Sequence, residues 1–101
     1  MTAAHAPTKD QFAKQVDTTF YATAPSGREF EMSLSRFHDI FDSERQETFS
    51  LLFKAPVDLE PEQGTYSISN SEIGDQAIFL VPVERDAGGV YFEAVYNRFK
   101  E

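Results

Sequence analysis

The stretch AIFLVPVERDAGGVYFEAVY, residues 77–96, decides the fold. Two apolar segments, 77–83 and 90–96, flank the sequence DAGG at 86–89, which is typical of a tight turn between antiparallel strands. The first segment is apolar on both faces, which predicts the most buried strand of the sheet, with Phe79 and Leu80 both buried. A β-branched residue at Gly89 is expected to be costly, because the turn favours a positive φ there. The fold is therefore expected to be built on β-hairpins.

Alternating apolar and polar residues predict further strands on both sides of this hairpin. Phe37 falls on the face opposite Leu34, which indicates a bulge or a strand that is buried on both faces. Pro82 lacks the amide hydrogen that a strand ladder needs, and it predicts a bulge or the start of a sheet edge. The expected strands cover residues 19–23, 30–35, 49–53, 66–68, 77–83 and 90–96.

Six strands with short connections predict an all-β domain formed by an antiparallel meander. The sheet is expected to form a small barrel or a two-layer sandwich, and the barrel is favoured because consecutive hairpins suffice to build it. The connection 55–63 carries two prolines and three acids, and it is interpreted as an ordered crossing between two hairpin groups. A chain of this length supplies one hydrophobic core, so residues 8–101 are expected to be a single domain.

One short helix is expected before the first strand. Thr8 and Gln11 have the spacing of a capping box, in which each side chain accepts a hydrogen bond from the other residue's backbone. The helix is predicted over 9–15, with Phe12 and Val16 directed toward the sheet. Residues 1–7 show no periodicity and are predicted to be a flexible tail.

Composition excludes several classes of function. Seventeen acidic and nine basic residues give a net charge of −8, which disfavours nucleic-acid and anionic-membrane partners. There is no cysteine, so disulfides and thiolate catalysis are excluded. The segment 77–83 is too short to cross a bilayer, and the first residues lack the pattern of a signal peptide. These features predict a cytoplasmic protein.

No residue pattern indicates catalysis or cofactor binding. The histidines His5 and His38 match no metal-ligand spacing, and the acidic stretches 42–44 and 58–62 lack the glycine of a calcium loop. No serine lies in a nucleophile motif. We therefore predict no catalytic residue, no metal ligand and no cofactor. A hydrolase using paired carboxylates is the least favoured of the alternatives.

Aromatic residues supply the candidate interaction surface. Most of the ten phenylalanines and four tyrosines fall on the inner phase of the alternation and are expected in the core. Tyr21, Phe37 and Tyr91 fall on the outer phase, where exposed rings beside an unpaired strand edge would form a contact patch. This pattern predicts a protein partner with a neutral or basic surface; the oligomeric state is left open. The alternative is a small β-barrel that binds an apolar or sugar-like ligand.

Five sequence blocks carry a family resemblance: LLFKAP at 51–56, QGTY at 63–66, FLVPV at 79–83, DAGG at 86–89 and YFEAVYN at 91–97. Over residues 12–97, the chain resembles a family of small uncharacterised bacterial β-rich domains. Phe92 stands where these relatives often have tyrosine. The resemblance implies no catalytic activity. It implies an assembly or accessory role, because genes of the family often lie near genes for phage-tail-collar or fibre-like proteins.

Overall fold

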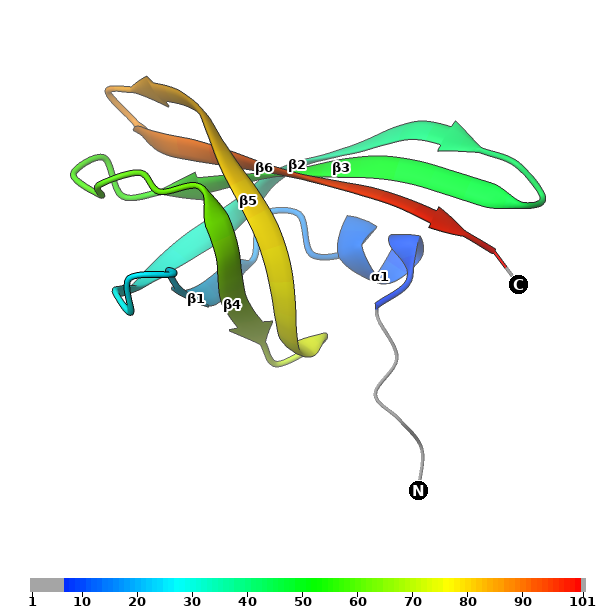
Figure 1. The fold of residues 1–101 in the computed structure, drawn as a ribbon, viewed down its shortest axis with the longest axis horizontal. Coiled ribbons are helices and arrows are strands. Elements are labelled where there is room, and N and C mark those ends of the chain that lie inside the picture. The colour runs from blue at the N-terminus through cyan, green and yellow to red at the C-terminus, as the bar shows by residue number, and fades with distance from the viewer. Residues whose placement is uncertain (1–6, 101) are drawn as a thin grey trace.

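The computed structural model describes residues 7–100, which form six antiparallel strands and one short helix (Figure 1). Each of the six predicted strands is present, so the expected all-β class is confirmed. No helix in the described part of the chain is long and apolar enough to span a membrane. The elements are α1 (Lys9–Ala13), β1 (Thr19–Thr23), β2 (Glu29–Asp42), β3 (Gln46–Ala55), β4 (Gly64–Asn70), β5 (Gly74–Asp86) and β6 (Gly89–Phe99).

The strands close into a ring in the order β1-β2-β3-β6-β5-β4, with β4 pairing back onto β1. The strands β1, β2 and β3 form one run of hairpins, and β4, β5 and β6 form another. The predicted meander is interrupted at one place, because β3 pairs with β6 and not with β4. The connection between β3 and β4 therefore joins two hairpin groups, as the prolines and acids of that segment indicated.

The ring opens along part of its length. β5 pairs with β4 through its first half and with β6 only from Val81 onward, so β6 has no β5 partner beyond Glu93. β2 likewise has no β1 partner beyond Ser33. The free halves continue with β3 as a three-stranded extension, here called the arm, which extends to the right in Figure 1. The arm comprises residues 36–42 of β2, 46–51 of β3 and 94–99 of β6.

Large side chains fill the inside of the ring. The rings of Phe20 and Phe53 meet edge-on with their centroids 5.3 Å apart, and Tyr66 lies 5.5 Å from Phe92. Burial of this aromatic and aliphatic area is the main stabilising contribution to the fold. The other fully buried large residues of the ring are Leu34, Ile68, Leu80 and Val90.

The helix α1 covers one face of the arm. Its capping box is present as predicted: the Gln11 N–H donates to the Thr8 hydroxyl over 3.1 Å, and the Thr8 N–H donates to the Gln11 side chain over 2.7 Å. Phe12 packs against Phe49 and Tyr96, at centroid distances of 6.0 and 5.3 Å. The helix ends at Ala13, two residues earlier than predicted.

The flexible tail predicted over residues 1–7 is one residue too long, because it includes Pro7. Pro7 is buried, and its carbonyl accepts a hydrogen bond of 2.8 Å from the Arg98 guanidinium. The segment that leads into α1 is therefore held against the arm from Pro7 onward. The rest of the predicted tail, residues 1–6, lies outside the described residues.

The prediction that residues 77–83 are buried on both faces is wrong. Ile78 and Leu80 are buried, whereas Phe79 is 53% exposed and Val83 is 50% exposed. β5 is part of the wall of the ring, and only one of its faces lies inside. The ladder shifts register between Pro82 and Glu84, which confirms the bulge that the proline predicted.

Gly89, in the turn between β5 and β6, cannot carry a side chain, but the reason differs from the one predicted. The Asp86 carboxylate accepts hydrogen bonds from the backbone N–H groups of Gly88 and Gly89, over 2.8 and 3.1 Å. The φ of Gly89 is not positive, so the expected backbone reason is wrong. A Cβ at Gly89 would instead lie 2.5 Å from the carbonyl oxygen of Ala55. The close approach of β3 is what excludes a side chain.

Candidate functional site

The three aromatic residues of the predicted interaction surface do not lie together. Tyr21 is in β1 and is 59% exposed on the outside of the ring. Tyr91 is half-buried in β6, opposite Lys54 of β3 and Glu84 of β5. Neither lies beside a free strand edge, because β1 and this part of β6 have a partner on both sides.

The placement of Phe37 on the outer surface is wrong. The register of β2 against β3 shifts between Leu34 and Arg36, so the strand gains one residue and its side chains change face. Phe37 therefore returns to the inner face of the arm, where its ring stacks on Phe49 at a centroid distance of 5.5 Å. The residue belongs to the core beneath α1.

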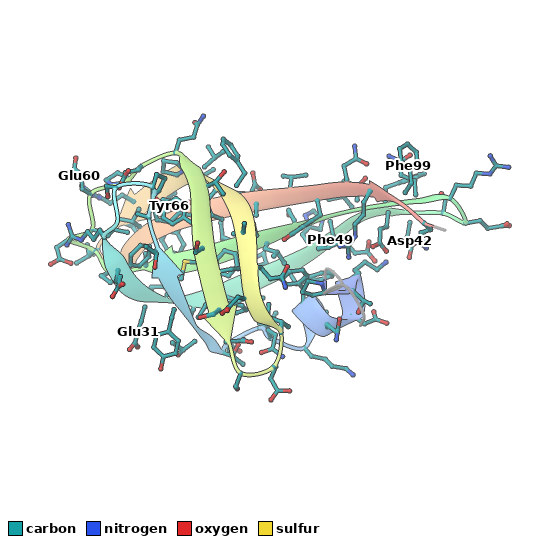
Figure 2. All side chains as sticks on the ribbon, turned by 60° about the horizontal axis from the view of Figure 1, so that its bottom comes forward. Glu31, Asp42, Phe49, Glu60, Tyr66 and Phe99 are labelled. Atoms are coloured by element: carbon teal, nitrogen blue, oxygen red, sulfur yellow. The ribbon has the colours of Figure 1, made fainter. Side chains whose placement is uncertain are left out.

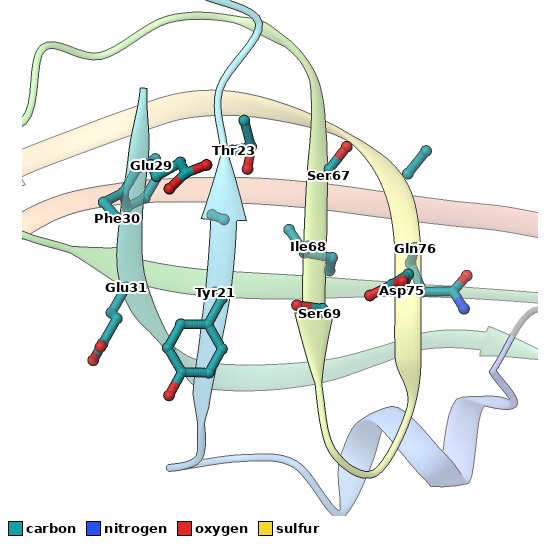
Figure 3. A pocket seen from close by; sticks show the side chains of 12 residues that line it. Tyr21, Thr23, Glu29, Phe30, Glu31, Ser67, Ile68, Ser69, Asp75 and Gln76 are labelled. Atoms are coloured by element: carbon teal, nitrogen blue, oxygen red, sulfur yellow. The ribbon is translucent and has the colours of Figure 1, made fainter. Parts of the chain in front are cut away.

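Tyr21 stands in a groove on the outer surface of the ring (Figure 3). The groove has a volume of about 780 Å³ and crosses β2, β1, β4 and β5. Strand pairing sets two rows of side chains across it, because directly paired residues of antiparallel strands face the same side. The first row is Glu31, Tyr21, Ser69 and Asp75, and the second is Glu29, Thr23, Ser67 and Ala77.

The floor of the groove is made by short side chains. Ser67 and Ser69 of β4 project little above the sheet, whereas Tyr21 and Glu31 extend outward beside them (Figure 3). Ala77 of β5, which has only a methyl side chain, also lines the groove. The hollow therefore follows from which residues the pairing of β1 with β4 brings together. It presents hydroxyl groups at its floor, and one aromatic ring and carboxylates beside them.

The groove is acidic, and no ion pair among residues 7–100 involves its carboxylates. Glu29, Glu31 and Asp75 are exposed, and none of their carboxylates forms an ion pair or a side-chain hydrogen bond with another described residue. The ion pairs of the described chain lie on the arm. Lys9 pairs with Asp39 and Asp42, Lys100 pairs with Asp42, and Arg98 pairs with Glu47.

These groups are suited to binding a cation. Carboxylate and hydroxyl oxygens accept hydrogen bonds from ammonium and guanidinium groups, and the face of a tyrosine ring attracts the same groups. In the part of the chain that the structure describes, no histidine, lysine or arginine lines the groove. Among the described residues, no cluster of three or more histidine, aspartate or glutamate side chains is arranged to hold a metal ion. His38, the histidine of the described chain, lies on the arm opposite Ser50.

The interior offers little to a ligand. The buried Tyr66 hydroxyl donates to the carbonyl oxygen of Glu62 over 2.6 Å, and burial raises the pKa of this hydroxyl. Burial also raises the pKa of the Tyr96 hydroxyl, because Tyr96 lies on the face of the arm that α1 covers. Throughout residues 7–100, every buried side-chain nitrogen and oxygen has a hydrogen-bond partner. The unsatisfied polar groups therefore face outward.

Sequence reasoning found Tyr21 but missed the acids around it. Glu29 and Glu31 alternate with Phe30, so their outward direction could be inferred from the sequence. Asp75 reaches the same surface only because β4 pairs with both β1 and β5. The pairing of β1 with β4 joins residues more than forty positions apart, and no local sequence pattern predicts it.

Comparison with known proteins gives a match to a family model. No curated protein and no solved structure matches the chain significantly. A family model described as "Domain of unknown function (DUF6916)" matches residues 7–96.

Proposed function

The chain belongs to the DUF6916 family, and we propose that it is a non-catalytic domain that binds a basic segment of another protein in the groove around Tyr21. One observation carries the proposal: Glu29, Glu31 and Asp75 surround an exposed tyrosine, and no described cation pairs with them. A Lys or Arg side chain over the Tyr21 ring would be within reach of carboxylates on both sides.

The size of the groove limits the kind of partner. A volume of about 780 Å³ is within the range of small-molecule and peptide sites, and it accommodates a few side chains and not a folded surface. The partner segment is therefore expected to be short and extended, with lysine or arginine at spaced positions. The carboxylates are exposed, so each contact contributes modestly and is screened by salt. We expect weak binding that several copies of the segment would strengthen.

This proposal keeps the partner class that the family resemblance implies. A fibre-like protein repeats its segments along its length, and a weak site on an accessory domain gains occupancy from such repetition. An assembly role alongside a tail-fibre-like protein is thus one form of the proposed function. The chemistry of the groove requires only that the presented segment be basic.

Surface binding accounts for the structure better than the two alternatives. A ligand inside the ring would have to displace fully buried residues such as Phe20, Phe53 and Tyr66. A glycoside hydrolase needs a general acid whose pKa is raised by burial, and the three groove carboxylates are exposed. The first observation favours binding at the outer surface over binding inside the ring, and the second favours recognition over catalysis.

The test is a binding titration with a fluorescein-labelled peptide Gly-Lys-Arg-Lys-Arg-Gly, compared with the same peptide carrying glutamate in place of lysine and arginine. We expect only the basic peptide to bind, and to bind less tightly as salt rises. The double variant Glu29→Gln/Glu31→Gln should weaken binding about twofold or more, because each exposed ion pair contributes about 0.2–1 kcal/mol.

The control removes the same charge elsewhere. Glu60 and Glu84 are exposed and lie outside the groove, so Glu60→Gln/Glu84→Gln should bind nearly as the unmodified chain does. Equal losses in both double variants would show that the peptide responds only to net charge. That result would overturn the groove as the binding site. The groove would also be overturned if Tyr21→Ala and Glu29→Gln/Glu31→Gln both bound the basic peptide with the affinity of the unmodified chain.

A further inference from the structure

We propose that this chain forms a symmetric homodimer by antiparallel pairing of the free edge of β6, residues 95–99, with the same edge of a second copy. This inference is independent of the groove, since none of the groove residues belongs to the arm.

The first observation is that this edge is unpaired. The pairing of β5 with β6 ends at Glu93, whereas β6 continues to Phe99. In antiparallel strands every second residue directs its N–H and C=O to one side, so residues 94–99 present a set of such groups to the free side. No backbone or side-chain hydrogen bond from another part of residues 7–100 reaches that side. Such an edge is a template for another strand.

The second observation is a difference between the two edges of the arm. The β2 edge has two register shifts, after Leu34 and after Asp39, and the ion pairs of Lys9 with Asp39 and Asp42 lie along it. Bulges and charges of this kind block edge-to-edge association. In contrast, β6 pairs with β3 without a shift over all ten pairs from Val90 to Phe99. The β6 edge thus lacks the register shifts that protect the β2 edge.

The third observation concerns the apolar residues beside this edge. Val95 is 58% exposed and Phe99 is 81% exposed. They alternate with the inward-facing Tyr96 and Arg98, so they lie on the face of the arm away from α1. Figure 2 shows Phe99 on the side of the arm opposite to α1, and Phe49 between the arm and the helix. Exposed apolar side chains at an open strand edge are expected to be covered by a partner.

A second copy fits this edge in one register. When two β6 strands pair antiparallel about Asn97, Val95 of each copy lies opposite Phe99 of the other, and Tyr96 lies opposite Arg98. Apolar pairs and a cation beside an aromatic ring both stabilise cross-strand contacts. The Asn97 side-chain oxygen already accepts from Gln46 and Thr48 within its own chain, over 2.6 and 3.1 Å. Its amide nitrogen is left for the symmetry mate.

The neighbouring registers are poorer. Pairing about Tyr96 would place Val95 opposite Asn97 and leave Phe99 against Glu93. Pairing about Arg98 would place two guanidinium groups directly opposite each other, which is repulsive. The β6 sequence therefore complements itself best about Asn97, and this selects a second copy as the occupant over an unrelated strand.

The absence of cysteine from the chain allows a direct test of this register by disulfide trapping under mild oxidation. Asn97→Cys should form a covalent dimer, because directly opposite residues in an antiparallel pair lie within the reach of a disulfide. Val95→Cys alone should not, whereas an equal mixture of Val95→Cys and Phe99→Cys should give the mixed dimer. Val83→Cys, an equally exposed control on the ring, should stay monomeric.

Sedimentation of the unmodified chain over a range of concentrations provides the second readout. We expect a reversible dimer whose dissociation constant rises about tenfold or more in Val95→Glu, because a carboxylate would then replace the apolar contact with the Phe99 ring at the interface. Val83→Glu should leave it unchanged, and circular dichroism should show both variants folded. A chain that is monomeric at all concentrations would overturn the proposal. A dimer that Val95→Glu does not weaken, or trapping by Val83→Cys as efficient as by Asn97→Cys, would also overturn it.

Discussion

Phe79 and Leu80 are neighbours in the sequence and similar in hydrophobicity, but they lie in different environments. Leu80 is fully buried inside the ring, whereas Phe79 is 53% exposed on its outer wall, opposite Thr65 of β4. A hydrophobic scale cannot separate them. The separation comes from the direction of each Cβ on the strand and from the absence of a second layer over this wall among the described residues.

The two residues should therefore differ in their effect on stability. We expect Leu80→Ala to lower the free energy of unfolding by about 2–5 kcal/mol, because it leaves a cavity in the ring. Phe79→Ala should lower it by about 1 kcal/mol or less, as is usual for exposed positions. Urea titration followed by circular dichroism measures both. A loss from Phe79→Ala equal to that from Leu80→Ala would mean that another element covers this wall in solution.

At the scale of elements, α1 is attached to the arm by an apolar contact and by a charged contact. Phe12 supplies the first through its packing on Phe49 and Tyr96. Lys9 supplies the second through hydrogen bonds to Asp42 and Asp39, which raise the pKa of its ammonium group. Lys100 donates to the same Asp42 carboxylate from the end of β6. Asp42 thus joins three segments: α1, the end of β2 and the chain beyond β6.

This arrangement makes the stability of the arm depend on pH. Hydrogen bonds from Lys100 and from Lys9 lower the pKa of Asp42 from 3.8 to about 2. A carboxyl group whose folded pKa is depressed stabilises the fold above its unfolded pKa, and this contribution is lost as the pH falls through the folded value. We expect the melting temperature to fall less between pH 5 and pH 2 in Asp42→Asn than in the unmodified chain.

The matched control for this experiment is Asp58→Asn. Asp58 is exposed and forms none of the ion pairs of the described chain. Its acid dependence should match that of the unmodified protein. If Asp42→Asn and the unmodified chain lost stability in parallel between pH 5 and pH 2, the contacts with Lys9 and Lys100 would not contribute in solution.

At the scale of the whole molecule, the groove and the arm are separate. The groove is made by the ring strands β1 and β4 with parts of β2 and β5. The arm depends on Phe49, whose ring lies 5.0 Å from Tyr96, 5.5 Å from Phe37 and 6.0 Å from Phe12. The Arg98 guanidinium also lies over Phe49, 5.2 Å from the ring centroid. Core changes in the arm should therefore leave the groove intact.

The variant Phe49→Leu tests this separation. It should lower the melting temperature, because it removes the aromatic contacts of Phe49 with Phe12, Phe37 and Tyr96. Below that temperature it should bind the basic peptide with an affinity within about twofold of the unmodified chain, since distant sites are usually independent. Paired thermal melts and peptide titrations provide the measurement. A large loss of affinity in a folded Phe49→Leu protein would show that the arm shapes the groove.

Local sequence patterns predicted the helix and the strands, but they did not predict which distant segments pair with each other. The capping box of Thr8 and Gln11 spans four residues, and the alternation around Met32 and Leu34 spans a single strand; both are determined by nearby atoms. The pairing of β1 with β4 determines which acids surround Tyr21, and it depends on how the whole sheet closes. The bulge after Leu34 places the Phe37 side chain on the inner face of the arm. Where the alternation of apolar and polar residues is interrupted, the sequence does not show on which face of the strand the next apolar residue lies.

The strand order has a symmetry of its own. Exchanging β1, β2 and β3 for β4, β5 and β6 leaves every neighbour relation in the ring unchanged. The chain is thus organised as two three-stranded halves fused in tandem, and the connection over residues 56–63 is their covalent link. It is anchored by the buried Leu59, whose carbonyl accepts a hydrogen bond of 2.7 Å from Arg85. A break in the chain within this link would remove no strand pair, so each half would keep every strand that it contributes to the ring.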